Sequence, residues 1–311
     1  MNGESMEKVI QHILSKEMKD VLMVQTSALK AIHDYMWKHE ILQLMPVMLS
    51  SVTDPLSHSV YDSSITYAGQ KLELTKSMIL HKQMSMMRGD LKGIYIISPN
   101  IRLEKEHLGE TGRHLLEFSQ VDIELRDAKY KDFMGFTEGL YSYIFKFVKK
   151  KCKEELASLE RKIKVPKKPF KIYESAMELK VEYGSSFDLE LSKKEKDLFW
   201  VMDHYREFYD REDPVTKRHV NYDLVYPEGF GEALSGGERE TDYATIIRKM
   251  GERKTDLEKY KSYIEISKRG LLKPTAGGGF GVERLVRFLT GRKHIRDISL
   301  FPRVPGEEIV L

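Results

Sequence analysis

Residues 102–118 have the sequence RLEKEHLGETGRHLLEF and connect two predicted strands. Ile94–Ile97 predicts a short buried strand, and the apolar pattern in Glu117–Leu125 predicts a second one. Arg102 and Arg113 therefore lie on a polar loop between strands. Fixed guanidinium groups bind phosphate oxygens in pairs and stabilise the charge that builds up during attack on an α-phosphorus. Taken alone, such a loop is more often a solvated, charge-balanced hairpin.

A second candidate site is the string Gly277-Gly278-Gly279-Phe280-Gly281, which predicts a tight turn that opens the last helix. Glycines allow the backbone to approach a nucleotide closely, and Arg284 in the first helical turn can reach a terminal phosphate. A glycine-rich helix start is by itself a weak signal and is often only a structural turn.

A third candidate site consists of two acids on predicted paired strands. Asp223 falls in Asn221–Tyr226, and Glu232 falls in Gly231–Leu234. Magnesium takes one or two carboxylates together with phosphate oxygens and waters. The pair is therefore a candidate metal site, although isolated acids are more often surface residues.

The rest of the chain predicts alternating helices and strands. Ser27–His39 has helical spacing, and the apolar segment Ile41–Leu49 predicts an edge strand, because Pro46 lacks the N–H that a central strand donates. Further helices are predicted at Ser77–Arg88, at Asp132–Lys162, and near Thr241 and Asp256.

Composition indicates a globular protein built as one unit. The chain has 311 residues, 41% of them hydrophobic and 32% charged, and the connector Lys164–Pro169 is too short to separate two domains. Its 51 basic and 48 acidic residues nearly balance, which excludes a general polyanion-binding surface. Cys152 is the single cysteine, so no internal disulfide forms. We find neither a leader nor an apolar stretch of membrane-spanning length and expect a cytoplasmic protein.

Taken together and in this order, the strings resemble the three signature motifs of class II aminoacyl-tRNA synthetases, most closely the archaeal-type aspartyl-tRNA synthetases. The resemblance covers nearly the whole chain and includes Tyr222–Tyr226 and the ending Ile295–Arg303. It implies an α+β fold, in which helices flank an antiparallel sheet, and a single catalytic domain over residues 1–311. It also implies a homodimer formed through residues 27–49.

The resemblance implies a role for each matching residue, most of them in binding ATP. Arg102 would bind the α-phosphate, Arg284 would bind the γ-phosphate from the other side, and Phe118 would stack on adenine. Glu232 would join the two arginines in catalysis and would hold Mg²⁺ with Asp223. The complete set of expected ATP ligands is Arg102, Glu104, Arg113, His114, Phe118, Glu232, Gly281 and Arg284.

The aspartate-specific relatives clamp the side-chain carboxylate of their substrate with a lysine and an arginine, and both are present. Lys82 closes the string that begins at Ser77, and Arg239 follows a Gly-Gly pair. Two cations at one small site favour an acid over its amide. The resemblance therefore implies aspartate as the substrate, bound by Lys82, Arg239, Asp54 and Ser77. Without its matching neighbours, Lys82 would be interpreted as a helix-surface lysine.

Departures from the synthetase pattern change the expected acceptor. The family's Thr-Glu-Gly-Gly is here Thr53-Asp54-Pro55-Leu56, and Ile79 replaces a glutamine, both at positions that hold the substrate's ammonium group. After the clamp, Glu240 and Asp242 replace basic residues; a solvated loop is their usual role, and an ammonium site is the alternative. The chain begins almost directly at the catalytic core, without an anticodon-binding barrel, so tRNA is not expected as a partner.

With these departures the chain resembles the archaeal asparagine synthetases. Turning aspartate end for end would let the clamp bind the α-carboxylate and present the β-carboxylate to ATP. Ammonia would then attack a β-aspartyl-adenylate, giving asparagine, AMP and pyrophosphate. Ammonia is expected as the direct nitrogen source, because a glutamine-hydrolysing domain needs a nucleophilic cysteine and Cys152 lies in a lysine-rich helix. The alternatives are a transferase that gives aspartate to tRNA or another acceptor, and a catalytically silent binding subunit.

Overall fold

Within the described residues, 3–56 and 58–309, the computed structural model contains an eight-stranded sheet and a separate three-stranded one. Neighbouring strands of the large sheet run antiparallel, except for one parallel pair at each edge. This arrangement confirms the expected α+β fold. In spatial order the strands are β1 (Leu42–Gln43), β5 (Gly93–Ile101), β6 (Glu117–Arg126), β11 (Thr275–Gly281), β10 (Gly231–Glu238), β9 (Asn221–Tyr226), β8 (Phe199–Met202) and β7 (Lys171–Tyr173).

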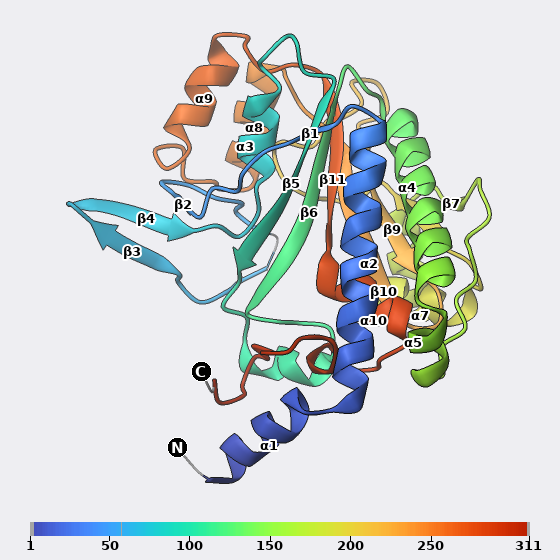
Figure 1. Ribbon diagram of the computed structural model, residues 1–311. Helices are drawn as coiled ribbons and strands as arrows, with labels where there is room; N and C mark the ends of the chain where they lie inside the picture. The colour runs from blue at the N-terminus through green and yellow to red at the C-terminus, as the bar shows by residue number, and fades with distance from the viewer. Residues whose placement is uncertain (1–2, 57, 310–311) are drawn as a thin grey trace.

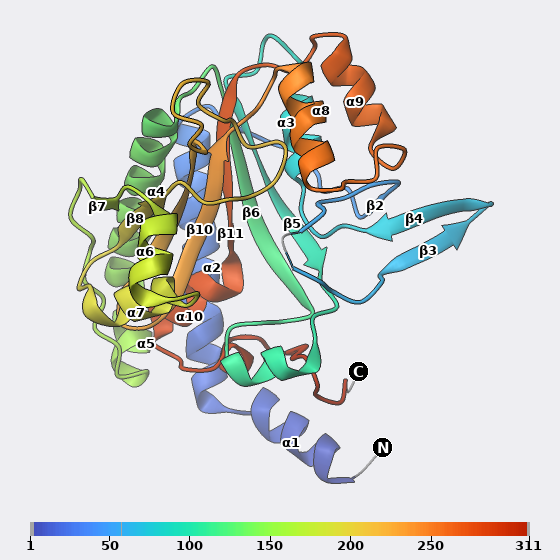
Figure 2. The same ribbon diagram turned by 180° about the vertical axis from the view of Figure 1, so that it is seen from behind.

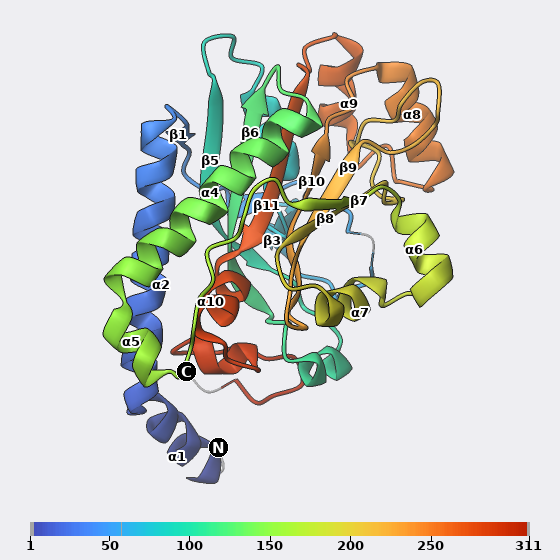
Figure 3. The same cartoon turned by 90° about the vertical axis from the view of Figure 1, so that its right-hand side faces the viewer.

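Two long helices, α2 (Lys16–Lys38) and α4 (Tyr130–Lys151), lie side by side across one face of the large sheet (Figures 1 and 3). Their apolar residues recur at helical spacing and pack with β6, β10 and β11 into the main core. The structure extends α2 well before the predicted start at Ser27. It also ends α4 early, because Cys152 adopts a non-helical conformation before the short α5 (Lys153–Ser158).

A second layer of helices packs near one end of the opposite face (Figure 2). It consists of α3 (Ile79–Ser85), α8 (Tyr243–Glu252) and α9 (Lys261–Lys268), which share an apolar cluster separate from the main core. The helices predicted at Ser77–Arg88 and near Thr241 are therefore confirmed, whereas the helix predicted near Asp256 begins only at Lys261. The remaining helices are α1 (Gly3–Ile13), η1 (Glu106–Thr111), α6 (Ala176–Tyr183), α7 (Phe187–Lys194), α10 (Val282–Thr290) and η2 (Ile295–Ile298).

A small sheet projects from the body of the molecule (Figures 1 and 2). It is a hairpin of β3 (Ser64–Tyr67) and β4 (Gln70–Leu74), with β2 (Leu49–Ser50) on the other side of β4. The predicted strand Ile41–Leu49 is thus divided between the two sheets, and Pro46 lies in the gap between β1 and β2. The predicted edge position is confirmed for β1, which pairs only with β5 among the described strands.

The glycine-rich segment is the end of strand β11, so the predicted tight turn at Gly277–Gly281 is wrong. Glycine is required there because the neighbouring strands leave no space for side chains. A Cβ atom on Gly277 would lie 1.9 Å from Glu124 Oε2, and one on Gly236 would lie 2.2 Å from the Gly277 carbonyl oxygen. The glycines therefore allow an acid of β6 to lie directly over the middle of the sheet. Helix α10 begins immediately after the strand, as predicted.

The segment expected to form the dimer exposes large apolar side chains. Trp37 is 86% exposed and Met45 is 83% exposed, with Leu42 and Leu49 also at the surface. Such side chains are seldom left in water without a partner surface when they occur together. In the part of the chain that the structure describes, no helix combines the length and the apolar character needed to cross a bilayer.

Candidate active site

A cavity of about 450 Å³ lies on the sheet face opposite α2 and α4. Side chains alternate along β6, so that Val121 and Ile123 pack into the main core while Gln120 and Asp122 line the cavity. The predicted motifs, which are far apart in sequence, meet here. The predicted residues that line the cavity are Asp54, Ser77, Lys82, Arg102, Glu104, Arg113, His114, Phe118, Asp223, Glu232, Arg239, Gly281 and Arg284.

Three arginines with partly exposed side chains define what we call the outer end of the cavity. Arg102 follows β5, Arg113 precedes β6, and Arg284 lies in the first turn of α10. The Arg102 Nε donates to the Lys76 carbonyl oxygen at 3.0 Å, and its guanidinium carbon lies 5.1 Å from the centroid of the Phe118 ring. The backbone thus fixes the direction of Arg102 and leaves its terminal nitrogens available.

Glu232 is the acid around which the outer-end cations gather. Arg284 Nη1 donates to Glu232 Oε1 at 3.2 Å. Burial favours the protonated carboxyl, but Arg284, Arg206 and Arg113 oppose it, and together they hold the pKa of Glu232 below its usual value. Glu232 is therefore ionised at neutral pH and balances part of the positive charge.

Asp223 lies on the neighbouring strand, and its pKa is shifted in the opposite direction to that of Glu232. Its carboxylate forms an ion pair with Arg206 at 2.5 Å. His204 Nε2 lies 3.3 Å from the same carboxylate, but burial lowers the pKa of His204 to about 3, so this histidine is neutral. Burial raises the pKa of Asp223 to about 6; the charge of Arg206 opposes this shift, and the charge of Glu232 adds to it. The two carboxylates thus interact electrostatically inside one cavity.

A pair of acids of this kind fits Mg²⁺. Among the described residues, no three or more His, Cys, Asp or Glu side chains are grouped to hold a metal ion by themselves. Magnesium commonly takes one or two carboxylates and completes its shell with phosphate oxygens and waters. Asp223 and Glu232, which would repel each other when both are ionised, provide such a partial donor set.

Two histidines accompany the predicted adenosine contact at Glu104. Both Glu104 oxygens lie 3.1 Å from His58 Nε2. Burial alone would raise the pKa of Glu104, but the hydrogen bond with His58 and nearby positive charges outweigh burial, so the pKa is lowered. The second histidine, His114, is largely buried, and its pKa is lowered to about 4. Burial is the largest cause, followed by the charges of Arg284 and Arg113. His114 is therefore neutral at physiological pH.

The inner end of the cavity, which we define by Lys82 and Arg239, is almost fully buried. Lys82 Nζ donates to Asp122 Oδ1 at 2.9 Å and to the Gly278 carbonyl oxygen at 3.3 Å. It also lies 3.7 Å from Glu124 Oε2. The lysine is therefore ion-paired inside the protein rather than extended into solvent.

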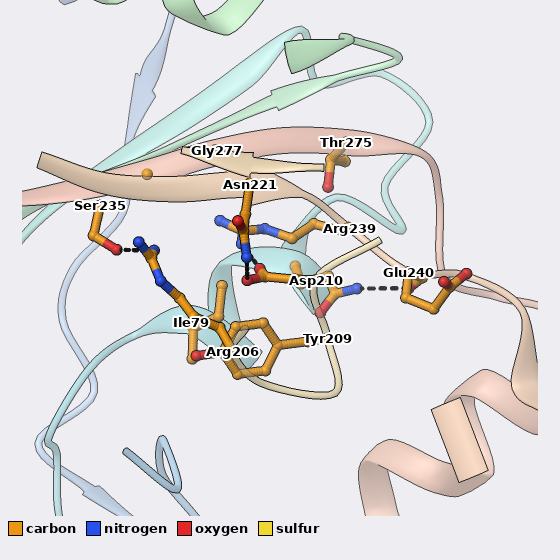
Figure 4. Close-up of polar contacts among 12 residues, drawn as sticks. Ile79, Arg206, Tyr209, Asp210, Asn221, Ser235, Arg239, Glu240, Thr275 and Gly277 are labelled. Atoms are coloured by element: carbon orange, nitrogen blue, oxygen red, sulfur yellow. Dashed lines mark hydrogen bonds and ion pairs between the residues drawn. The ribbon is translucent and has the colours of Figure 1, made fainter. Parts of the chain in front are cut away.

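Arg239 is held by acids from two separate elements. Its Nε and Nη2 donate to the two oxygens of Glu124 at 3.0 and 3.2 Å, and its Nη1 donates to Asp210 Oδ1 at 3.2 Å. Asp210 is held in turn by Asn221, whose Nδ2 donates to Asp210 Oδ2 at 2.8 Å (Figure 4). A guanidinium group with a bidentate partner on one side and a third bond on another has little freedom to rotate.

The acid partners Asp122, Glu124 and Asp210 are the residues that sequence reasoning missed. Two of them carried a signal, because Val121-Asp122-Ile123-Glu124 alternates apolar and acidic residues inside a predicted buried strand. Such alternation means that one strand face is polar and holds partners for cations. Asp210 had no comparable local signal, since only tertiary folding brings it to Arg239.

The segment with Asp54 closes the inner end from another side. Asp54 Oδ1 accepts a hydrogen bond from the Tyr209 hydroxyl at 3.2 Å, and Ser77 Oγ accepts one from the Ile79 amide at 3.2 Å. Ile79 packs in the same apolar cluster as Tyr209, and both line the cavity together with Arg206 (Figure 4). Where the resemblance places a polar glutamine, the cavity therefore has an apolar wall.

Glu240 and Asp242 do not line the cavity, so the structure gives no ammonium site to them. Glu240 is buried, and its carboxylate accepts hydrogen bonds from three backbone amides, including those of Thr241 and Asp242. Asp242 caps α8 by accepting from the Thr245 amide at 2.8 Å. Their roles are structural, and the expected solvated loop is wrong for Glu240.

Comparison with known families gives a match along almost the whole chain. Residues 3–305 match the family model described as tRNA synthetases class II (D, K and N). An aspartate–tRNA(Asp/Asn) ligase from Methanopyrus kandleri is 32% identical over 257 residues, covering 77% of this chain and 57% of that relative. An asparagine–tRNA ligase from Pyrococcus abyssi is 28% identical, and the match covers 95% of this chain and 70% of that relative. This chain thus spans only part of the length of the curated relatives that it matches.

Solved structures show the same fold. The asparaginyl-tRNA synthetase from Pyrococcus horikoshii complexed with asparaginyl-adenylate superposes with a TM-score of 0.87 over 100% of this chain and 74% of that one. The sequences are 24% identical, so the likeness concerns the fold. The aspartyl-tRNA synthetase from Entamoeba histolytica gives a TM-score of 0.75 at 22% identity, over 94% of this chain and 59% of that one.

Proposed function

The chain belongs to the class II tRNA synthetases of the D, K and N type, and from this premise we propose that it uses ATP to activate aspartate as an adenylate. We propose further that ammonia attacks this adenylate, giving asparagine, AMP and pyrophosphate. One observation carries both proposals: the outer-end arginines and the buried inner-end cations line the same cavity. A triphosphate and a small dicarboxylate can therefore meet there with their reacting atoms held close.

The outer end has the charge that a triphosphate needs. Arg102 would stabilise the charge that develops on the α-phosphate, and Arg113 and Arg284 would bind the outer phosphates. Phe118, which already lies below the Arg102 guanidinium, offers a ring on which adenine can stack. Asp223 and Glu232 would hold Mg²⁺, which when bound neutralises part of the phosphate charge.

The inner end keeps enough donors for one carboxylate. Arg239 uses three of its five N–H groups on Glu124 and Asp210, so two remain for a ligand. Lys82 uses two of its three on Asp122 and a backbone carbonyl. The acids around these cations fix their positions in advance, so a bound carboxylate loses little affinity to ordering.

Which carboxylate of aspartate occupies the inner end decides the product. With the α-carboxylate on Lys82 and Arg239, the β-carboxylate is left to attack the α-phosphorus, and ammonia then converts it to the side-chain amide. This orientation is supported by Asp54 and Ile79, which change the region where related synthetases hold the substrate's ammonium. The reversed substrate can place its ammonium near Asp122 Oδ2, a buried atom without a hydrogen-bond partner among the described residues.

Product identification tests this proposal. The protein is incubated with labelled aspartate, ATP, Mg²⁺ and ammonium, with and without tRNA, and the labelled products and AMP are separated. Free asparagine formed without tRNA supports the ligase reaction. Aspartyl-tRNA in place of asparagine would show that the chain is a transferase, the alternative favoured by its tRNA-ligase relatives. Neither product and no AMP would indicate a catalytically silent binding subunit.

We also propose that the protein forms a homodimer through residues 27–49, whose exposed apolar side chains support a self-contact. Replacing both Trp37 and Met45 by lysine places four buried charges in a symmetric interface and is expected to give monomers in light scattering. The exposed Met177 lies on α6, outside that segment, and Met177→Lys is the matched control. A double variant with unchanged mass in solution would contradict this interface.

A further inference from the structure

The ligase reaction proposed above requires a group that handles ammonium, and the inference drawn here rests on that reaction. At neutral pH, dissolved ammonia is mostly ammonium, which has no lone pair with which to attack a carbonyl carbon. A protein that uses it must first bind a small cation beside the adenylate and then remove a proton. Both tasks suit a carboxylate that lines the cavity and has no partner of its own.

Glu207 is such a carboxylate. It lies in the connection between β8 and β9, two residues before Tyr209, and its side chain lines the cavity. In the part of the chain that the structure describes, no hydrogen bond or ion pair reaches its carboxylate. The neighbours in the same segment differ, because Arg206 bonds to Ser235 and Tyr209 bonds to Asp54.

The cavity contains more unpaired carboxylate oxygens than aspartate alone can use. Among the described residues, Asp122 Oδ2 and Glu283 Oε2 are buried without a hydrogen-bond partner, and neither oxygen of Glu207 has one. Glu283 is held through its other oxygen, which accepts a hydrogen bond from the Ser119 amide at 2.9 Å. Aspartate brings a single ammonium group, which Asp122 can bind, so Glu207 is left for another cation. The inner-end acids Glu124 and Asp210 are already bound to Arg239 and do not compete for it.

We propose that Glu207 binds ammonium in the cavity and accepts the proton that must leave before nitrogen attacks the β-aspartyl-adenylate. Ammonium gives one proton to the Glu207 carboxylate and becomes ammonia. The ammonia lone pair forms the C–N bond at the activated carbonyl carbon, and the C–O bond to the phosphate breaks with its electron pair leaving on AMP. The nitrogen releases a second proton to solvent, which gives the amide.

The charges around Glu207 suit a proton acceptor. Burial raises its pKa to about 7, with Asp54 and Asp210 adding to the shift and Arg253 and Arg206 opposing it. Asp54 approaches from the segment after β2, Arg253 from the end of α8, and Arg206 and Asp210 from the same connection as Glu207. A carboxylate with this pKa holds a proton long enough to accept it from ammonium and releases it again near neutral pH.

Hydroxylamine provides the test, because it is largely unprotonated at neutral pH and attacks an adenylate without losing a proton first. In Glu207→Gln we expect kcat/KM for ammonium to fall by about 100-fold or more, while hydroxamate formation from hydroxylamine falls far less. Aspartate-dependent exchange between pyrophosphate and ATP reports adenylate formation and should also fall far less. Glu207→Asp should recover part of the ammonium-dependent rate, because it restores a carboxylate. Glu154→Gln, an exposed change on α5, is the matched control.

The outcomes separate this role from the ligase reaction itself. If the wild-type protein makes no asparagine from ammonium, the proposed function fails and the role of Glu207 fails with it. If the wild-type protein makes asparagine and Glu207→Gln loses ammonium and hydroxylamine reactions equally, Glu207 is only structural. Retention of the full ammonium-dependent rate in Glu207→Gln would also overturn the proposal.

Discussion

At the outer end of the cavity, Arg113 and Arg284 stay 32% and 26% exposed, whereas Lys82 and Arg239 at the inner end are each 2% exposed. Among the outer cations, Arg284 pairs with Glu232 at 3.2 Å and Arg113 lies 3.5 Å from Asp188. The inner cations each contact two buried acids. In the proposed reaction both ends receive negative charge, yet they balance their own charges in different ways.

The difference follows from the size of what each end would bind. A triphosphate carries several charges and would remain partly hydrated, so partly exposed arginines with few acid partners can bind it. In the proposed reaction one carboxylate of aspartate would lose its water entirely, and a buried cation without acids nearby would be too costly to keep in the apo protein. The inner end is therefore organised before substrate arrives, and its charges also contribute to folding.

The largest expected effect is the loss of the inner arginine. Arg239→Met removes the cation that binds both buried acids, Glu124 and Asp210, and should destabilise the protein by about 3–5 kcal/mol in chemical denaturation. Arg248→Met is the control; it removes an arginine whose side chain is 43% exposed in two surface ion pairs and should cost about 1 kcal/mol or less. An equal loss of unfolding free energy in the two variants would contradict the view that the inner-end arginine contributes to folding in a way that an exposed arginine does not.

Loss of an outer arginine should act on the rate instead of on folding. Arg102→Ala removes a donor that would stabilise charge on the α-phosphate, and we expect AMP release to slow by about 100- to 1000-fold. The free energy of unfolding should change by about 1 kcal/mol or less, because the side chain is partly exposed. Arg88→Ala, at a side chain 71% exposed, is the control. A nearly unchanged rate would mean that ATP binds elsewhere.

The positive charge of the outer end should also affect how the stability of the protein depends on pH, through the titration of His114. The pKa of His114 is lowered by burial and by Arg284 and Arg113 to about 4, below the usual value of 6.5. The unfolded chain therefore takes up a proton near pH 6.5 while the folded protein does not, and stability falls as pH drops from about 6.5 to about 4. His114→Gln should make this part of the curve flatter, by at most about 3 kcal/mol.

The matched variant for that titration is His107→Gln, because His107 is exposed and lies outside the cavity lining. Its stability curve should follow that of the wild-type protein between pH 4 and 6.5, the range set by His114. Parallel curves for wild type and His114→Gln would contradict the account of a cation-rich outer end.

The smallest expected effect is at the ring beneath Arg102. Phe118→Leu keeps an apolar side chain but removes the aromatic face, and we expect the KM for ATP to rise by about fivefold, or about 1 kcal/mol. The KM for aspartate should stay the same, because the inner end does not contain the ring. Phe301→Leu, at a surface residue 47% exposed, is the control. An unchanged KM for ATP would show that adenine does not stack on Phe118.

The positions of the chemical groups were largely predictable from sequence because they depend on local spacing. Arg102 and Arg113 flank a loop between two strands, and Arg284 occupies the first turn of a helix, as their sequence neighbours indicate. These relations hold whatever the rest of the fold does. The fold class was implied by the resemblance to the class II synthetases, whereas the apolar patterns predicted only the individual strands and helices.

What could not be predicted depends on contacts between segments that are distant in sequence. Gly277 occupies a strand because Glu124 fills the space beside it, a fact that no local pattern contains. Asp210 reaches Arg239 only when the connection before β9 folds over the sheet. The glycine run therefore led to a wrong turn prediction, and the counter-ions of the inner end were missed.

The central claim, that the β-carboxylate of aspartate is the group activated, has a direct measurement. Aspartate labelled with heavy oxygen in its β-carboxylate is incubated with ATP, Mg²⁺ and ammonium, and the released AMP is analysed by mass spectrometry. Attack of the β-carboxylate on the α-phosphorus leaves one labelled oxygen on AMP, because the C–O bond of the adenylate breaks when nitrogen adds. The account predicts labelled AMP. Unlabelled AMP from the β-labelled substrate, with label transferred instead from the α-carboxylate, would contradict it.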